Sequence, residues 1–410
     1  MTARRAPSGG RSGLDGPPIA NTHLHVPPNF SAFETVEDAA ATAGREHVAV
    51  AGTSNFHDLR VYERFRAAAE RAGVVPLYGF EFISVLDDAE REGHRVNDPE
   101  NPGRAYLCGK GIPEPWDPGP AARERLGVAR SLNEARMERM AARLRDVFAD
   151  SGLETDLDHE AVAADVAAHA QVPRDWVVLQ ERHVAEAFQG TLFGSLDADG
   201  RRAVLARAYG ESPRAALDDP IAVQGEIRSR LMKAGGPAFE PESPIPFDAA
   251  YALVLDLHAI PCYPTLADGA HPTCEWETPP AALVERILER GIHTAELIPI
   301  RNRPEVVEEY VAAWRPAGIV VMAGTEHNTK ARIPVEPRCL DGLPLPPAAR
   351  EAFWEGTCVV AAHQHLRSTG RAGYVDDEGR LNTGFPDGET RIRWFRELGE
   401  ELIRERGRAA

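Results

Sequence analysis

The chain has 410 residues, of which 43% are hydrophobic and 27% are charged. One hydrophobic core rarely exceeds about 250–300 residues, so this length favours a barrel-sized domain with an insertion over one undivided core. Acidic residues outnumber basic ones by 63 to 46 and give a formal net charge of −17. Such a surface repels nucleic acids and anionic membranes, so we expect neither as a partner.

The five cysteines include no CxxC pair, which argues against a disulfide framework and a zinc knuckle. A reduced, cytoplasmic location is the simplest interpretation. Residues 1–17 are rich in Arg, Gly and Ser and lack the apolar segment of a signal peptide, so we expect a disordered tail. No apolar run reaches the roughly 20 residues that a membrane span requires.

Residues 18–115 alternate short apolar runs with helical patterns, which indicates parallel βα units and the first part of a barrel. The expected strands are Ile19–His23, Val48–Thr53 and Val74–Tyr78, and the expected helices are Val36–Arg45 and Asp58–Arg71.

Residues 116–245 lose this alternation and predict a helical insertion. The expected helices are Ser131–Asp150, His159–Ala170, Glu181–Gln189 and Arg201–Tyr209, with one short strand at Trp176–Leu179.

Residues 246–375 return to the βα pattern and predict the second part of the barrel, followed by an extension over 376–410. The expected strands are Ile260–Tyr263, Thr294–Ile298, Ile319–Ala323 and Cys358–Ala361. The expected helices are Ala249–Leu257, Pro280–Arg290, Glu305–Trp314 and the terminal Glu389–Arg408.

The segment around residue 23 carries the strongest chemical signal. His23 and His25 occupy alternate positions of a strand, so their side chains point to the same face. Two imidazoles on one face at the end of a strand can bind one metal ion. A second HxH pair, His363 and His365, is as readily explained by a helix or loop on the surface.

Similar polar residues follow later strands of the same pattern. His57 follows the second strand, Glu81 follows the third, and Glu326 with His327 follows a strand near residue 323. Because the carboxyl ends of barrel strands meet at one mouth, we expect these side chains to gather there.

This ordered set resembles the motif series of the PHP family, the polymerase and histidinol phosphatase class of metal-dependent phosphoesterases. The similarity covers about residues 18–113 and 246–330 and extends to a divergent subgroup with a helical insertion and no settled activity. The resemblance implies a distorted seven-stranded (β/α) TIM-like barrel and up to three divalent ions that activate water against a phosphate ester.

The sequence departs from the family pattern at several positions. The second motif, usually Asp-His-Asp, is Asn55, Phe56 and His57 here. A histidine that usually precedes a proline is replaced by Tyr263, and the last motif carries Glu326 and Asn328. Fewer ligands predict one or two ions, of manganese, zinc or iron, in place of three.

The mechanism expected from the residues and the resemblance is metal-assisted hydrolysis of a small anionic phosphorylated substrate. His23, His25 and Glu81 would hold a metal, and His57 and Glu326 would complete the site. Asp58 or His327 would carry the proton, and Arg301 would bind the anionic end.

Two other functions fit the sequence. An amidohydrolase-like barrel also opens with an HxH segment, but it would cleave C–N or C–O bonds. Gly79-Phe80-Glu81 favours the phosphoesterase. A non-catalytic metal-binding sensor or scaffold is favoured by the changes at Phe56 and Tyr263. The sequence indicates neither the substrate nor the oligomeric state.

Overall fold

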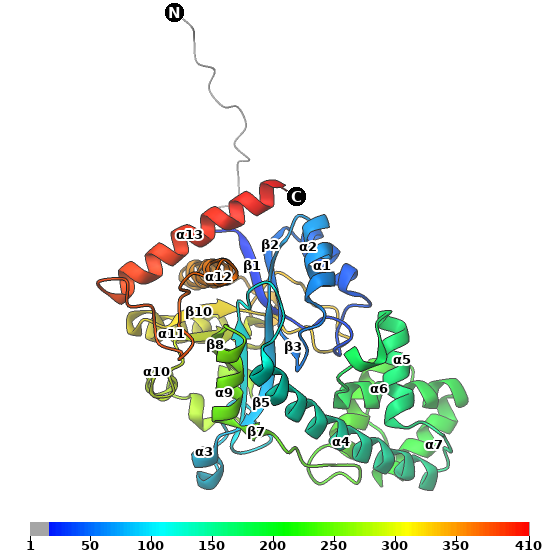
Figure 1. Ribbon diagram of the computed structural model, residues 1–410. Coiled ribbons are helices and arrows are strands. Elements are labelled where there is room, and N and C mark those ends of the chain that lie inside the picture. Colours follow the sequence, from blue (N-terminus) through cyan, green and yellow to red (C-terminus); the bar gives the residue numbers. More distant parts are fainter. Residues whose placement is uncertain (1–15, 410) are drawn as a thin grey trace, which may run out of the picture.

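The computed structural model describes residues 16–409, so most of the predicted disordered tail, residues 1–17, lies outside the described residues. The fold is mixed α/β, with strands in the centre, helices around them and a helical part on one side (Figure 1). No helix of the described part is both long and apolar enough to cross a membrane.

The first sheet contains three parallel strands near the N-terminus. It pairs β1 (Ile19–Leu24) with β2 (Val48–Thr53) and β2 with β4 (Val75–Leu77). The connections are α1 (Val36–Arg45) and α2 (Tyr62–Arg71). Thr35 caps α1, because its side-chain oxygen accepts a hydrogen bond from the Asp38 amide at 3.0 Å.

The second sheet has seven strands and mixed directions. Its order is β10 (Val320–Ala323), β9 (Thr294–Leu297), β8 (Ile260–Thr265), β6 (Arg104–Lys110), β5 (Gly79–Val85) and β3 (Asn55–Phe56), with β7 (Ile245–Pro246) beside β5. β6 runs antiparallel to both β5 and β8, which corrects the expectation of purely parallel βα units. β5 and β6 are joined by residues 86–103, which contain only the short α3 in place of a crossover helix of full length.

The two sheets meet at two places. A single parallel bridge joins Leu24 at the end of β1 to Glu326, and β3 begins two residues after β2 ends. Among residues 16–409 the strands are nevertheless paired as two sheets and do not form one closed ring. The alternation of strands and helices is therefore as expected, whereas a closed barrel is not shown.

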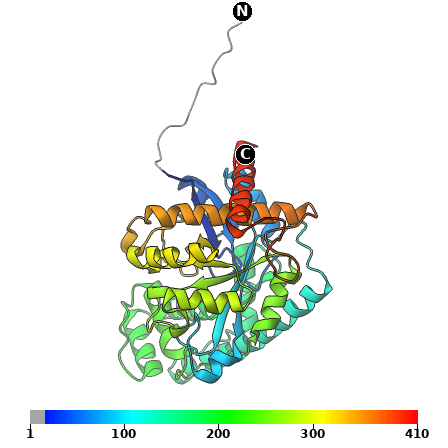
Figure 2. The same cartoon turned by 90° about the vertical axis from the view of Figure 1, so that its left-hand side faces the viewer.

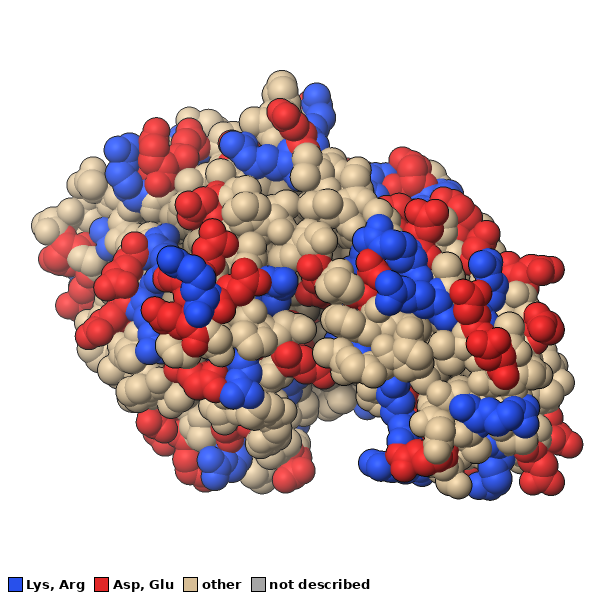
Figure 3. All heavy atoms as spheres, turned by 90° about the horizontal axis from the view of Figure 1, so that it is seen from below, with Lys and Arg blue, Asp and Glu red and all other residues tan. Residues whose placement is uncertain are grey.

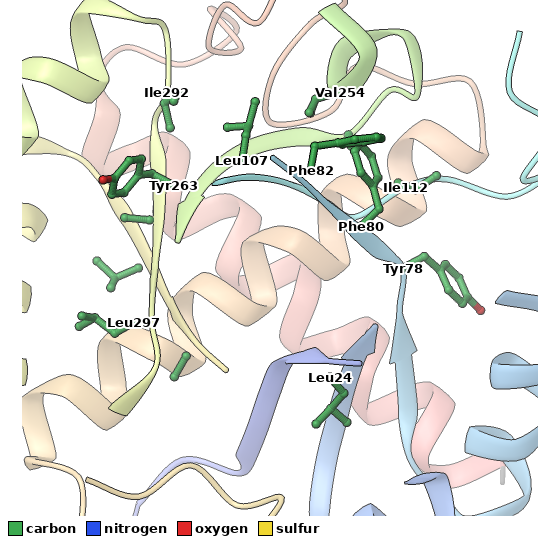
Figure 4. Close-up of a cluster of buried hydrophobic side chains, with 14 of the residues drawn as sticks. Leu24, Tyr78, Phe80, Phe82, Leu107, Ile112, Val254, Tyr263, Ile292 and Leu297 are labelled. Carbon is green, nitrogen blue, oxygen red and sulfur yellow. The ribbon is translucent and has the colours of Figure 1, made fainter. Parts of the chain in front are cut away.

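Helices cover the outer faces of the sheets. They include α3 (Asp87–Glu92), α9 (Phe247–Asp256), α10 (Pro280–Glu289), α11 (Pro304–Trp314), α12 (Pro347–Ser368) and α13 (Gly388–Ala409). α10 packs on α11 and α11 on α12, and α13 crosses α12 on the outside (Figure 2). The main core includes Phe80, Phe82, Leu107 and Tyr263 (Figure 4).

The expected strand Cys358–Ala361 is wrong, because these residues lie inside α12. Their apolar run is explained by burial of the helix between β10 and α13. The expected strand Trp176–Leu179 is wrong as well, since only a short 3-10 turn, Arg174–Trp176, precedes extended chain there.

A helical segment separates β6 from β7. It contains α4 (Pro120–Asp150), α5 (His159–Ala170), α6 (Glu181–Ser195), α7 (Ala198–Tyr209), α8 (Pro220–Ile227) and a π-helical turn, Arg228–Met232. Its buried residues form a second hydrophobic core, which includes Phe148, Phe188 and Leu192.

Candidate metal centre

His23 and His25 lie at the end of β1, where alternate side chains face the same way. Both are buried, and their Nε2 atoms are 3.2 Å apart. Glu81 of β5 approaches from the other sheet, with carboxylate oxygens 3.9 Å from His23 Nε2 and 3.6 Å from His25 Nε2. The three ligand atoms lie within 4.8 Å of one another, which is the spacing of a candidate metal site.

Hydrogen bonds determine the tautomers of both histidines. His23 Nδ1 lies 2.7 Å from a carboxylate oxygen of Glu296, which can only accept, so Nδ1 carries the proton. His25 Nδ1 lies 3.4 Å from Asn29 Oδ1, an oxygen that also accepts the Phe56 amide at 2.5 Å. His25 Nδ1 is therefore also the donor, and in the neutral rings both Nε2 atoms keep a lone pair.

Two lone pairs that face each other at 3.2 Å repel unless a cation or proton lies between them. Burial lowers the pKa of His25 to about 3, so His25 does not take up a second proton at neutral pH. Two neutral imidazoles and a carboxylate are the donors that Zn²⁺, Mn²⁺ and Fe²⁺ accept. The residues present therefore fit a divalent metal.

A buried ion pair supports His23 from behind. Lys110 Nζ lies 2.8 and 2.9 Å from the two oxygens of Glu296 and also donates to the Thr22 carbonyl and to Ser54 Oγ, each at 2.9 Å. Burial raises the pKa of Glu296, but Lys110 and His23 outweigh it and hold the pKa at about 2. Glu296 is therefore an anion that keeps His23 in the metal-binding tautomer.

Glu81 and Glu326 bring two carboxylates to the same place. Burial and the charge of Glu326 raise the pKa of Glu81 well above its ordinary value. Burial raises the pKa of Glu326, but the cationic Arg301 and Arg182 act against burial, and the pKa is lowered. Arg301 and Asn328 both donate to Glu326 Oε2, the latter at 2.7 Å.

His57 lies beside this group and is not one of its three members. Its amide donates to the Glu81 carbonyl at 3.1 Å, and its ring stacks on Phe56 with 3.9 Å between ring centres. The side chain is buried and lines the same cavity as His25 and Glu81. Neither ring nitrogen has a hydrogen-bond partner among residues 16–409, and burial lowers the pKa to about 3.

The two residues expected to carry the proton do not line the cavity. Asp58 is buried and accepts the Arg60 amide at 3.2 Å, while its Oδ2 has no partner in the described part of the chain. Burial raises the pKa of Asp58 to about 6. His327 is bonded at both ring nitrogens, to Thr325 Oγ1 at 2.7 Å and to the Ile333 carbonyl at 3.1 Å.

A cavity of about 380 Å³ opens onto the candidate ligands. Its lining includes the apolar Phe56, Ile83 and Leu132, the cationic Arg182, Arg228 and Arg301, and the acidic Glu181, Glu242 and Glu326. It lies between the strands and the helical segment of α4 to α8. Viewed from below, the surface is hollowed between the two parts, and charged side chains lie along both edges (Figure 3).

Two solved structures resemble this chain. One is a provisionally assigned metal-dependent phosphoesterase from Bifidobacterium adolescentis, 15% identical, with a TM-score of 0.55 and coverage of 82% of this chain and 96% of that chain. The other is an amidohydrolase from Chromobacterium violaceum, solved with bound sulfate and no metal. It is 14% identical, with a TM-score of 0.53 and coverage of 80% of this chain and 93% of that chain.

No protein-family model and no curated protein sequence matches the chain. At 14–15% identity, the likeness to the two structures is one of fold. The chain therefore has a mixed α/β fold that is shared with proteins assigned as hydrolases, and it gathers a candidate metal-binding group between its two sheets.

Proposed function

We propose that the protein is a metal-dependent hydrolase that cleaves small anionic phosphate esters. The proposal depends on one observation. The Nε2 atoms of His23 and His25 and the carboxylate of Glu81 lie close together, in a buried position beside a cavity, where one metal ion could bind all three. When bound there, a divalent ion supplies Lewis acidity to the phosphate and lowers the pKa of water toward neutrality. The sequence motifs resemble those of the PHP family, whose members have a TIM-like barrel, and this resemblance supports the proposed function.

The chain's own residues prepare the site in three ways. His23 and His25 offer neutral donors, and Glu296 orients His23. Glu81 adds the negative charge that a cation needs. His57 has an unbonded ring nitrogen and lines the same cavity, so it could bind a second ion that shares Glu81. Glu326 lies beside this site and accepts a hydrogen bond from Arg301.

Two residues were expected to transfer the proton during hydrolysis, and the structure favours one of them. His327 uses both ring nitrogens in hydrogen bonds, so it would have to break one of them first. Asp58 keeps one free oxygen and has a pKa of about 6, raised by burial, which suits exchange near neutral pH. Asp58 is therefore the preferred carrier, by way of the neighbouring His57.

The test combines metal analysis with turnover. We expect one or two divalent ions per purified chain, and loss of metal in His23→Ala. Glu81→Gln should lower manganese-dependent hydrolysis of phenyl phosphate at least about tenfold, which is about 1.4 kcal/mol in the barrier. Glu92→Gln, which changes an exposed carboxylate of α3, serves as the matched control and should retain activity.

Other outcomes separate the alternatives. Cleavage of amides or lactones without cleavage of phosphate esters would indicate the amidohydrolase. An amidohydrolase centre would be expected to use Lys or His among its middle ligands. Lys110 is paired with Glu296, so its nitrogen is not free to serve as a metal ligand. Bound metal with no turnover of any ester, with manganese, zinc, iron or magnesium, would indicate a sensor or scaffold.

A further inference from the structure

Arg182 is a cation that the described part of the chain leaves without a partner. It is the second residue of α6 and lines the cavity beside the candidate metal centre. Arg301 pairs with Glu326, and Arg228 pairs with Glu181 at 2.9 Å. Arg182, by contrast, forms neither an ion pair nor a side-chain hydrogen bond with any of residues 16–409, although its side chain is half-buried.

The first turn of α6 is held rigidly in place around Arg182. The Phe30 amide, in the loop after His25, donates to Gln180 Oε1 at 2.8 Å. His183 packs edge-on against the Phe30 ring, and the Arg182 carbonyl accepts from Gln224 at 3.1 Å. The backbone that carries Arg182 is thus fixed to the segment that carries the histidines, and the N-terminus of a helix adds a partial positive charge.

The position of Arg182 costs stability in the absence of an anion. Burial and repulsion by Arg228 and Arg301 lower the pKa of Arg182 to about 10, and the attraction of Glu326 and Glu181 only partly offsets them. An unpaired cation beside two others destabilises a fold unless it serves another purpose. An anionic ligand would relieve that repulsion and could form two parallel hydrogen bonds with the guanidinium.

Arg182 and Glu81 reach the cavity from different parts of the chain, Arg182 from α6 of the helical segment and Glu81 from strand β5. The charges that act most strongly on Glu81 are those of Glu326, Lys110, Glu296 and Arg301. Those that act most strongly on Arg182 are Arg228, Arg301, Glu326 and Glu181. Arg301 and Glu326 act on both Glu81 and Arg182. Because Arg182 and Glu81 line one cavity from different elements, a ligand there can contact Arg182 with one group and the metal ligands with another.

We infer that Arg182 binds a second anionic group of the substrate, a carboxylate or phosphate remote from the ester that is cleaved. This inference rests on the proposed hydrolase function and narrows it to substrates with two anionic groups. Arg301, the residue expected from the sequence to bind the anion, donates to Glu326, whereas Arg182 has no such partner among residues 16–409. Arg182 comes from the helical segment, so that segment sets the specificity of the site.

Two phosphonates that cannot be hydrolysed test this inference by binding alone. Phenylphosphonate carries one anionic group and 4-carboxyphenylphosphonate carries two. Calorimetric titration of the manganese-loaded protein should show about tenfold tighter binding of the carboxylated compound, as one hydrogen-bonded charge pair provides. Arg182→Gln should abolish this preference, and Arg202→Gln, an exposed arginine on α7 outside the cavity, should retain it.

The thermal midpoint provides a check on folding. Arg182→Gln removes a repelled cation, so its midpoint without ligand should exceed that of the wild type, whereas Arg202→Gln should not raise it. A variant that binds neither compound but melts higher is still folded, and that result would show that Arg182 holds the phosphonate itself and would overturn the inference.

The remaining outcomes are equally decisive. Equal affinity of the wild type for both compounds, or a preference that survives Arg182→Gln, would overturn the inference. Turnover of phenyl phosphate tests the proposed function separately. Binding that depends on Arg182, without turnover of any ester, would reject the hydrolase and leave Arg182 as the site of the second anion.

Discussion

At the scale of single residues, the candidate centre depends on a buried ion pair that is hydrogen-bonded to a metal-binding histidine. His23, Glu296 and Lys110 follow one another with contacts of 2.7 and 2.8 Å, and all three side chains are almost fully buried. Removing one member of a buried ion pair leaves an uncompensated charge, which costs about 3–5 kcal/mol. The same bond fixes the tautomer of a metal-binding histidine, and loss of such a bond weakens metal affinity about 10–100-fold.

Substitution of Glu296 separates the two effects. Glu296→Gln should destabilise the protein by about 3 kcal/mol, because Lys110 then lacks its counter-ion. It should also weaken manganese binding about tenfold or more, because an amide no longer fixes the imidazole as a carboxylate does. Urea unfolding and competition with a chelator measure the two quantities.

The double variant Lys110→Met with Glu296→Gln is the control. It removes both charges, so most of the stability should return while metal affinity stays low. Metal affinity that recovers together with stability would contradict the role given to Glu296, since Lys110 alone would then explain the loss.

Residue patterns predicted part of this centre. His23 and His25 stand at the end of β1, as strand periodicity indicated, and Glu81 joins them from inside β5 and not from a strand end. Glu296 and Lys110 were missed. A charged residue in a buried strand was the available signal for both, with Glu296 inside β9 and Lys110 at the end of β6. Arg182 offered none, because its place beside the cavity depends on how the helical segment packs.

At the scale of elements, α13 approaches α12 through a glycine. A Cβ built on Gly399 would lie 2.0 Å from the Cys358 carbonyl oxygen, so any side chain forces the two helices apart. Gly399→Ala should therefore destabilise the protein by about 1–3 kcal/mol, measured by thermal unfolding.

Gly407 lies on the same helix and has nothing within 4 Å of its Cβ position. Gly407→Ala should therefore leave stability unchanged or raise it by about 0.5–1 kcal/mol, as alanine does in an open helix. Equal effects of the two substitutions would show that α13 is not docked through Gly399.

His363 makes α12 sensitive to pH. Its Nε2 donates to the His258 carbonyl at 2.8 Å, and its Nδ1 accepts the Tyr374 amide at 3.0 Å, so the neutral ring is fully bonded. Burial lowers its pKa to about 3, below the 6.5 of an unfolded histidine. The stability that His363 contributes is thus complete above pH 6.5 and is lost as the pH falls toward 3.

His363→Gln isolates this contribution, because an amide can make both hydrogen bonds and takes up no proton. Without added metal, the wild type should lose up to about 1.4 kcal/mol more than the variant for each pH unit between pH 6 and 4. His169→Gln, at an exposed position of α5, should follow the wild type. Parallel pH profiles for all three proteins would contradict the assignment.

The elements were predicted best where local signals decide them. α1 and α5 begin and end at the expected residues, and a capping side chain opens each of them. The β5–β6 pair was missed because its antiparallel direction depends on distant pairing with β8. The strand expected at Cys358–Ala361 failed because a helix buried on most sides has the same apolar run.

At the scale of the whole molecule, several polar contacts connect the strand region to the helical segment of α4 to α8, whose residues form the second core. Arg64 donates to the Ala170 carbonyl at 2.6 Å, and Lys330 lies 3.3 Å from Glu186. Partly exposed contacts of this kind contribute about 0–1 kcal/mol each. The exception is α4, whose Ala122 and Ala129 belong to the first core and whose later residues belong to the second.

The strength of this coupling decides how the protein unfolds. If the polar interface is weak, α4 can lose its order near the middle and the helical segment will unfold as a unit of its own. We therefore predict two transitions in urea. Leu192→Ala, in the second core, should shift only one of them, and Leu107→Ala, in the first core, only the other, each by about 2–5 kcal/mol. Manganese should stabilise the transition that Leu107→Ala shifts, because His23, His25 and Glu81 all come from the strands. A single transition that moves with either substitution would instead show that α4 joins both cores into one cooperative unit.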